Sequence, residues 1–250
     1  MLTATIKKKI GDKHGGIEMD LTISIKRGER IGLTGASGAG KTSLLRVLAG
    51  LEKPDAGMII VDGLPWVDTG AGIFVPPARR NIGFVFQDYA LFPNMTLRQN
   101  LSFASRRGAS DPMIAELIDI MGLSRHVHQR PCELSGGQKQ RAALARALVR
   151  SPRLLLMDEP LSALDRQTRK MLWRELNRIH ELYPVSMVLV SHDPEEIETL
   201  TDRSIEMHNG KILEDVFDSF VALPEGFGNV ATSLTEKEAV CGYKATHIGF

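Results

Sequence analysis

The sequence has few cysteines, no excess charge of either sign and no long apolar run. Its two cysteines, Cys132 and Cys241, are too few for a disulfide framework, so we expect a reducing compartment. Lysine and arginine total 31 against 30 aspartates and glutamates, which provides no basic field for nucleic acid or an anionic membrane surface. No stretch approaches about 18 apolar residues, and none follows the lysines at 7–9, so we expect neither a membrane span nor a signal peptide. Any membrane role must therefore come through a partner protein.

A glycine loop lies between a predicted strand and a predicted helix. Residues 31–34 form a short apolar run, and residues 43–48 carry apolar side chains at helical spacing. Between them, residues 35–42 read GASGAGKT and match the phosphate-loop pattern G-x-x-x-x-G-K-[ST]. Glycines let the backbone approach an anion, and the amides at a helix start attract it. The pattern arises by chance in roughly one per cent of chains this long. Its flanks favour a nucleotide site over an ordinary glycine turn.

Two side chains of this loop have separate predicted roles. Lys41 is placed to reach the outer phosphates of ATP, and Thr42 to put its hydroxyl on Mg²⁺. The predicted phosphate-binding set is Gly35, Ala36, Ser37, Gly38, Ala39, Gly40, Lys41, Thr42 and Ser43.

Two adjacent carboxylates, Asp158 and Glu159, follow the apolar run at 154–157. Asp158 is a candidate Mg²⁺ ligand. Glu159 is a candidate to orient or deprotonate the attacking water, a role worth about 10²–10⁴ in rate. A surface turn with two charges is the alternative, and the phosphate loop upstream disfavours it.

Gln87 and His192 also follow apolar runs, at 82–86 and 185–190. Gln87 is a candidate to bind Mg²⁺ or to touch the attacking water, although a single glutamine there is usually a turn residue. His192 is a candidate contact for the γ-phosphate, although a single histidine is more often structural. No nucleophile–base pattern accompanies it, so it is not part of a triad.

The order of predicted elements indicates an α/β protein with a P-loop NTPase core. Strands that alternate with helices imply a parallel sheet, whose ligands bind beyond the carboxyl ends of the strands. We expect an antiparallel β subdomain at the N-terminus and an inserted helical subdomain at about 88–151. Residues 64–80 look irregular, and Arg79 and Arg80 are interpreted as a solvated pair. The predicted domain is 1–214, followed by a tail at 215–250 with little pattern.

Ser135 stands before two glycines where another helix is expected to begin. A serine and two glycines at a helix start form a second candidate anion site. Simple capping of the helix by Ser135 is the alternative, and it is favoured on this segment alone.

Together these segments resemble the ATP-binding subunit of ABC transporters over about residues 15–214. The resemblance implies a head-to-tail homodimer in which a serine–glycine edge of one copy faces the ATP held by Lys41 of the other. Asp165 would lie at that interface, and Gln87 would begin the segment that senses transmembrane permease subunits. A substrate-binding protein would be an indirect partner, and the subunit would be peripheral at the cytoplasmic face of the inner membrane. The predicted edge consists of Ser135, Gly136, Gly137 and Gln138, and the matching motifs are GASGAGKT at 35–42, Gln87, LSGGQ at 134–138, LLLMDE at 154–159, SALD at 162–165 and His192.

Residues 62–101 look most like molybdate-type oxyanion importers, which implies molybdate or a related oxyanion as cargo. Another cargo, or a non-transport ABC ATPase, is the alternative. The family usually stacks adenine on an aromatic residue upstream of the phosphate loop, but residues 1–34 contain no Phe, Trp or Tyr. His14 is the candidate substitute. Residues 215–250 are too few for the C-terminal β domain that molybdate importers often carry.

Overall fold

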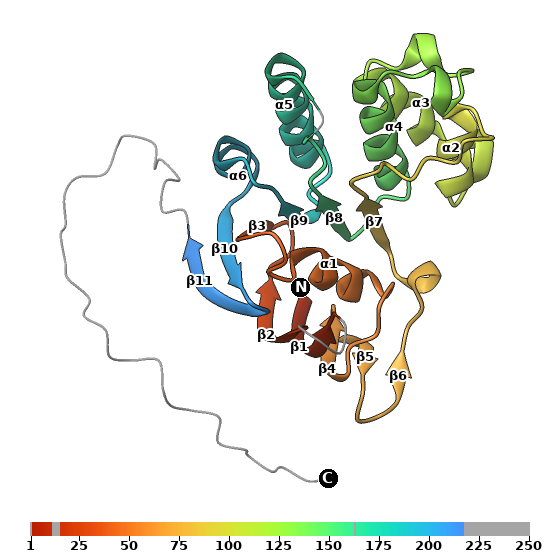
Figure 1. Ribbon diagram of the computed structural model, residues 1–250. Coiled ribbons are helices and arrows are strands. Elements are labelled where there is room, and N and C mark those ends of the chain that lie inside the picture. Colours follow the sequence, from red (N-terminus) through yellow and green to blue (C-terminus); the bar gives the residue numbers. More distant parts are fainter. Residues whose placement is uncertain (1, 12–15, 163, 218–250) are drawn as a thin grey trace, which may run out of the picture. The chain divides into compact units, whose positions relative to one another are not determined.

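The computed structural model describes residues 2–11, 16–162 and 164–217, which belong to one compact unit, 1–218 (Figure 1). The expectations for His14, for Cys241 and for the tail beyond residue 217 lie outside the described residues. None of the described helices is long and apolar enough to cross a membrane.

The larger sheet carries the parallel strands that the sequence predicts. Its strands β10, β3, β9, β8 and β7 run parallel, and β11 pairs antiparallel with β10. Strand β8 is buried along its whole length, which explains its unbroken apolar run. The strand order is β11 (Lys211–Phe217), β10 (Arg203–His208), β3 (Arg30–Thr34), β9 (Ser186–Val190), β8 (Leu154–Asp158) and β7 (Ile82–Val85).

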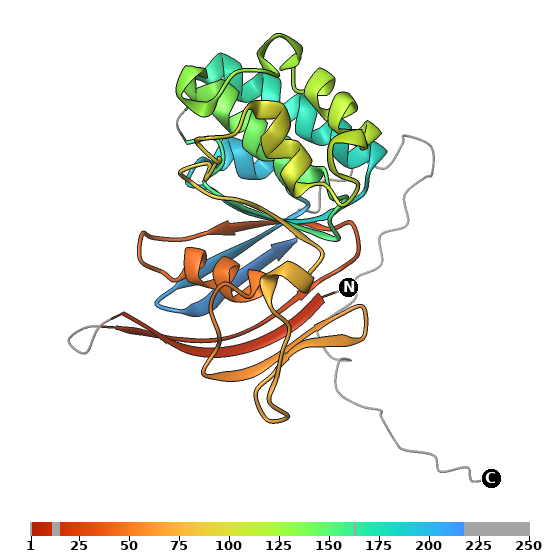
Figure 2. The same ribbon diagram turned by 90° about the vertical axis from the view of Figure 1, so that its right-hand side faces the viewer.

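The second sheet is antiparallel and includes the N-terminal strands. Helix α1 (Lys41–Ala49) lies between the two sheets and packs into one apolar cluster with both (Figure 2). The expectation that residues 64–80 are irregular is wrong, because they form β5, β6 and a 3₁₀ turn at Pro77–Arg79. The prolines and glycines of this stretch resemble loop signals, but Gly70 and Gly72 lie in the turn between β5 and β6, and Pro76 and Pro77 begin the 3₁₀ turn. The strand order is β2 (Ile17–Ile25), β1 (Leu2–Ile10), β4 (Ala56–Val61), β5 (Leu64–Asp68) and β6 (Ile73–Phe74).

The remaining helices lie across the larger sheet from α1 (Figure 2). Thr96, Asp111 and Ser135 cap three of them with their side chains, which satisfies amides that a helix start leaves unpaired. The helices are α2 (Leu97–Ala104), α3 (Pro112–Ile120), α4 (Gly136–Leu148), α5 (Arg166–Leu182) and α6 (Pro194–Leu200), with 3₁₀ turns at Gly108–Ser110, Ser124–His126 and Pro131–Glu133.

Arg80 corrects one sequence interpretation. Arg79 is exposed as expected, but Arg80 is only 1% exposed. Its guanidinium donates to three backbone carbonyls, including that of Leu48 at 2.8 Å near the end of α1. It also lies over the rings of Trp66 and Phe74, and burial lowers its pKa to about 10. Arg80 therefore ties the antiparallel sheet to the helix that follows the phosphate loop.

Candidate nucleotide site

The phosphate loop connects β3 to α1, as the sequence predicts. Its three glycines have φ between 80° and 125°, a region that favours glycine. A Cβ on Gly35 would lie 2.1 Å from the carbonyl oxygen of Met207. The amide of Gly210 donates to the carbonyl of Ala39 at 3.0 Å. The β10–β11 hairpin therefore holds the loop, a contact between distant segments that has no local signal in the sequence.

Lys41 is buried at the start of α1. Its ammonium donates to the carbonyls of Gly35 and Ala36 at 2.6 and 2.9 Å. Burial lowers the pKa of Lys41, while the carboxylates of Glu159 and Asp158 oppose that shift. A cation is thus held at the loop, beside two carboxylates.

The side-chain oxygens of Thr42 and Asp158 lie close together and are of the kind that binds magnesium. The Thr42 hydroxyl donates to Asp158 Oδ1 at 3.2 Å. Asp158 is buried at the end of β8, and this burial raises the pKa of its carboxyl group. A buried carboxylate next to a hydroxyl favours a hard cation, because the cation would offset the lost hydration.

The Glu159 carboxylate lies between the side chains of His192 and Gln87. His192 Nε2 is 3.0 Å from one of its carboxylate oxygens, and Gln87 Nε2 donates to the other at 3.4 Å. The Glu159 backbone has φ of 46°, which costs a non-glycine residue about 1–3 kcal/mol. Its amide donates to the carbonyl of Val190 at 3.0 Å, which holds it in place. The structure thus brings together residues from the ends of β7, β8 and β9.

The predicted serine–glycine edge begins α4, on the helical side of the larger sheet. Ser135 Oγ accepts from the amide of Gln138 at 3.3 Å, and Gln138 Oε1 accepts from the amide of Ser135 at 2.8 Å. Ser135 is therefore a helix cap, as the alternative interpretation holds. Ser135 and Gly136 are also exposed, and a Cβ on Gly136 would meet no atom within 4 Å. The edge is accessible to a ligand or another chain.

Asp165 caps the next helix, α5. Its carboxylate accepts from the hydroxyl of Thr168 at 2.6 Å and from the amide of the same residue at 3.0 Å. The hydrogen bond from the Thr168 hydroxyl is the main reason that the pKa of Asp165 is lowered, and the backbone hydrogen bond adds to it.

Residues 19–162 match the family described as "ABC transporter". The chain belongs to this family. It is 40% identical over 198 residues to the spermidine/putrescine import ATP-binding protein PotA of Protochlamydia amoebophila, covering 77% of this chain and 52% of that protein. It is 44% identical over 182 residues to the molybdenum import ATP-binding protein ModC of Rhizobium etli, covering 71% and 51%. The chain spans about half the length of these curated relatives.

A solved structure of the family shares the fold. The ATP-binding cassette MJ0796, in a dimeric post-hydrolysis state with ADP and Pi, superposes with a TM-score of 0.75 at 28% identity. The match covers 87% of this chain and 98% of that one. The predicted α/β fold and the family resemblance, including likeness to molybdate importers, are confirmed.

In this ABC family member, two polar residues near His192, Glu196 and Arg169, were not predicted as site residues from the sequence. Glu196 is 3% exposed and accepts a hydrogen bond from Ser191 Oγ at 2.5 Å. Burial raises its pKa to about 7. Arg169 forms an ion pair with Asp193. The Arg169–Asp193 pair has no local signal in the sequence, because it forms only where α5 packs against the start of α6. Glu196 has none either, because its burial is a property of the folded chain.

The surface beside the start of α1 is aliphatic. A Cβ on Gly40 would lie 3.5 Å from side-chain methyl groups of Ile10, Ile17 and Met19. These residues come from β1 and β2, and the first two face each other across the strands.

Proposed function

We propose that this chain is the ATP-binding and hydrolysing subunit of an ABC importer. The observation that carries the proposal is the position of Glu159, between Gln87 and His192 and directly after buried Asp158. A carboxylate held on both sides is oriented to accept a proton from water that attacks the γ-phosphate. Lys41 binds the outer phosphates.

Thr42 and Asp158 would hold Mg²⁺, with Gln87 as the third candidate ligand. The ion would neutralise charge on the phosphates. This chain's own contribution is to fix the hydroxyl and the carboxylate 3.2 Å apart at the end of β8.

The working unit is a head-to-tail homodimer. The exposed edge Ser135–Gln138 of one copy faces the ATP that Lys41 of the other copy holds, with Asp165 at the interface. Capping leaves Ser135 and Gly136 open to solvent, which supports this role. To move a closure equilibrium from 1:99 to 99:1 requires about 5.5 kcal/mol, roughly half from each nucleotide. Two or three charge-assisted hydrogen bonds per nucleotide supply about that much.

Permease subunits dock beside the segment that follows Gln87. Phe92 and Phe103 are exposed there and pack edge to face, with ring centroids 4.9 Å apart. Arg146 lies over the Phe92 ring and donates to the carbonyl of Ala90 at 2.6 Å, which fixes this surface to α4. An aromatic pair on a fixed support suits a helix of a membrane partner.

The subunit is peripheral at the cytoplasmic face of the inner membrane and acts with a substrate-binding protein through the permease. The ATPase domain covers the expected 1–214 and continues to Phe217, because β11 belongs to the larger sheet, and residues 88–151 are its helical subdomain. Adenine lies against the aliphatic surface of Ile10 and Ile17.

Molybdate or a related oxyanion is the proposed cargo, on the resemblance of residues 62–101 to molybdate importers. Relatives named for molybdenum and for polyamines are about equally similar. Uptake assays with labelled molybdate and spermidine in cells that lack this chain decide between them. A loss of spermidine uptake alone would overturn the oxyanion assignment.

Glu159→Gln tests the hydrolytic role directly. The variant should bind ATP like the natural chain and hydrolyse it at least about a hundredfold more slowly, because the amide cannot accept the proton. Glu181→Gln removes an exposed carboxylate on α5 and serves as the matched control. ATPase rates of the full chain provide the measurement, and normal turnover by Glu159→Gln would refute the assignment.

Co-purification separates transport from a non-transport ABC ATPase. The full chain, tagged and extracted in mild detergent from its own cells, should bring down a membrane protein. Substitution of both Phe92 and Phe103 by serine should release it. A chain that hydrolyses ATP but recovers ribosomes or no membrane protein would support the non-transport alternative.

A further inference from the structure

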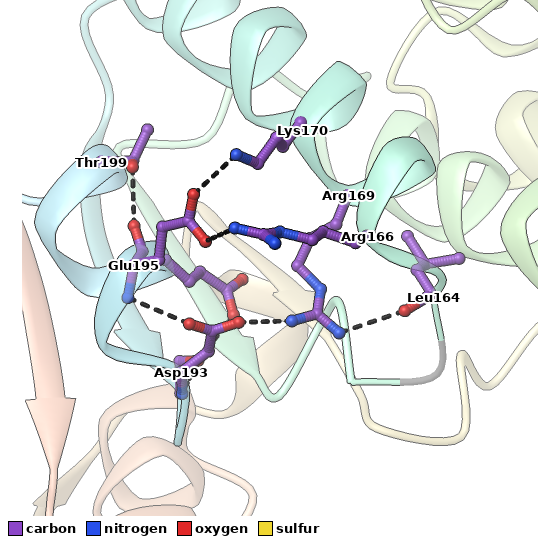
Figure 3. A network of polar contacts seen from close by, with 9 residues as sticks. Leu164, Arg166, Arg169, Lys170, Asp193, Glu195 and Thr199 are labelled. Atoms are coloured by element: carbon purple, nitrogen blue, oxygen red, sulfur yellow. Dashed lines mark hydrogen bonds and ion pairs between the residues drawn. The ribbon is translucent and has the colours of Figure 1, made fainter.

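Arg169 on α5 joins two loops that belong to different parts of the proposed site. One guanidinium nitrogen pairs with the carboxylate of Asp193, and another donates to the carbonyl of Leu164 at 3.1 Å (Figure 3). The side chains of Arg169 and Asp193 are only 22% and 29% exposed. Such a pair is screened less by solvent and salt than an exposed one.

The Leu164 end leads to the serine–glycine edge. Leu164 directly precedes Asp165, and its Cδ2 would lie 3.2 Å from a Cβ on Gly137. Leu164 itself is buried. A shift of Gly137 against a neighbouring copy would therefore press on the segment whose carbonyl Arg169 holds.

The Asp193 end leads to the catalytic pair. Asp193 directly follows His192, which lies 3.0 Å from Glu159. The amide of Asp193 donates to Ser191 Oγ at 3.0 Å, and its Oδ1 accepts from the amide of Glu195 at 3.0 Å. Asp193 thus fixes the backbone on the far side of His192.

We propose that Arg169 is a positioning residue that transmits movement of the serine–glycine edge to His192 and Glu159. The inference rests on the proposed function. A planar guanidinium can hold a carboxylate and a carbonyl at the same time, in fixed directions. Within one copy, Arg169 therefore connects the edge that meets one ATP to the histidine that serves the other.

Two neighbouring cations provide matched controls. Arg166 and Lys170, on the same helix, both pair with Glu195 and are 79% and 45% exposed (Figure 3). Each is placed like an exposed surface ion pair, which contributes little. The two cations pair with the Glu195 carboxylate, whereas Glu195 contacts Asp193 through its backbone amide, which neither substitution alters.

The test compares steady-state ATP hydrolysis by the full chain and by variants. Arg169→Met and Arg169→Lys should each lower kcat about ten- to a hundredfold, since small misplacement of a catalytic group has effects of that size. KM for ATP should stay within about twofold, because the phosphate loop is untouched. The Hill coefficient for ATP should fall towards one, because the two sites lose their connection. Arg166→Gln and Lys170→Gln should leave all three values unchanged.

Asp193→Asn keeps the experiment decisive if Arg169→Met does not fold. Asparagine caps helices as well as aspartate does, so α6 is retained while the ion pair is lost. Asp193→Asn should reproduce the loss of kcat and of cooperativity.

Normal kcat in folded Arg169→Met, or in Asp193→Asn, would overturn the inference. Equal losses in the two control variants, or a rise in KM that accounts for the loss, would also overturn it. A natural chain with no ATPase activity would instead refute the proposed function, so the two failures are distinguishable.

Discussion

Replacing Glu196 with glutamine should stabilise the fold at alkaline pH. Glu196 is 3% exposed, and burial raises its pKa from 4.5 to about 7. The Ser191 hydroxyl and the Arg169 cation favour the charged form, whereas Asp193 and Glu159 oppose it. Burial is the largest of these causes, so the folded protein binds a proton that the unfolded chain releases.

The pH dependence of the folding stability follows from the difference in the pKa of Glu196 between the folded and unfolded chains. A raised carboxyl pKa reduces stability as pH rises above 4.5, and the loss is complete above about pH 7. A shift from 4.5 to about 7 corresponds to about 3 kcal/mol. About 2 kcal/mol of this is lost between about pH 5 and about pH 8. Glutamine does not titrate, so the variant avoids that loss.

Urea unfolding followed by circular dichroism at several pH values measures the effect. The stability difference between Glu196→Gln and the natural chain should move in favour of the variant by about 2 kcal/mol from about pH 5 to about pH 8. Glu198→Gln, an exposed acid on the same helix, should change stability by less than about 0.5 kcal/mol. A pH-independent difference for Glu196→Gln would refute the reasoning.

Three further predictions concern the packing around Arg80 and the phosphate loop. Gly50→Ala should lower the free energy of unfolding by about 3 kcal/mol in chemical denaturation, because the φ of Gly50 is 78° and a Cβ would lie 2.5 Å from the buried Arg80 guanidinium. The control Gly63→Ala has the same φ but no atom of the described residues within 4 Å of its Cβ, so it should lower that free energy by only about 1 kcal/mol. Lys41→Ala should abolish tight ATP binding in titration calorimetry, and unchanged affinity would refute its phosphate contact. Thr42→Val should raise the Mg²⁺ concentration that half-activates ATP hydrolysis severalfold, and an unchanged magnesium dependence would remove Thr42 from the ion.

The sequence predicts those parts of the fold and site whose signals are local. The strand, loop and helix around Lys41 are contiguous in the chain, so their pattern is visible without tertiary structure. Gln87, Glu159 and His192 each follow an apolar run, and the parallel sheet explains why they meet. Adjacent strand ends therefore make a site predictable before the distances are known.

Contacts between distant segments could not be predicted in this way. Arg80 looks like a surface residue because nothing nearby in the sequence shows the carbonyls and rings that surround it. Arg169 lies on α5 and Asp193 caps the start of α6, with a strand between them in the sequence, and only the packing of α5 and α6 brings them together. Ser135 meets the expectation of a cap, yet a single chain does not contain the second copy that its proposed role requires.

Nucleotide-driven dimerisation of the Glu159→Gln chain tests the central proposal most directly. Light scattering during size-exclusion chromatography measures mass with ATP and magnesium, with ADP and magnesium, and after Ser135→Arg is added. We expect a dimer with ATP and magnesium, and a monomer with ADP and magnesium or when Ser135→Arg blocks the edge. A monomer under all conditions, both in solution and with the membrane subunits, or a dimer that Ser135→Arg leaves intact, would contradict the proposal.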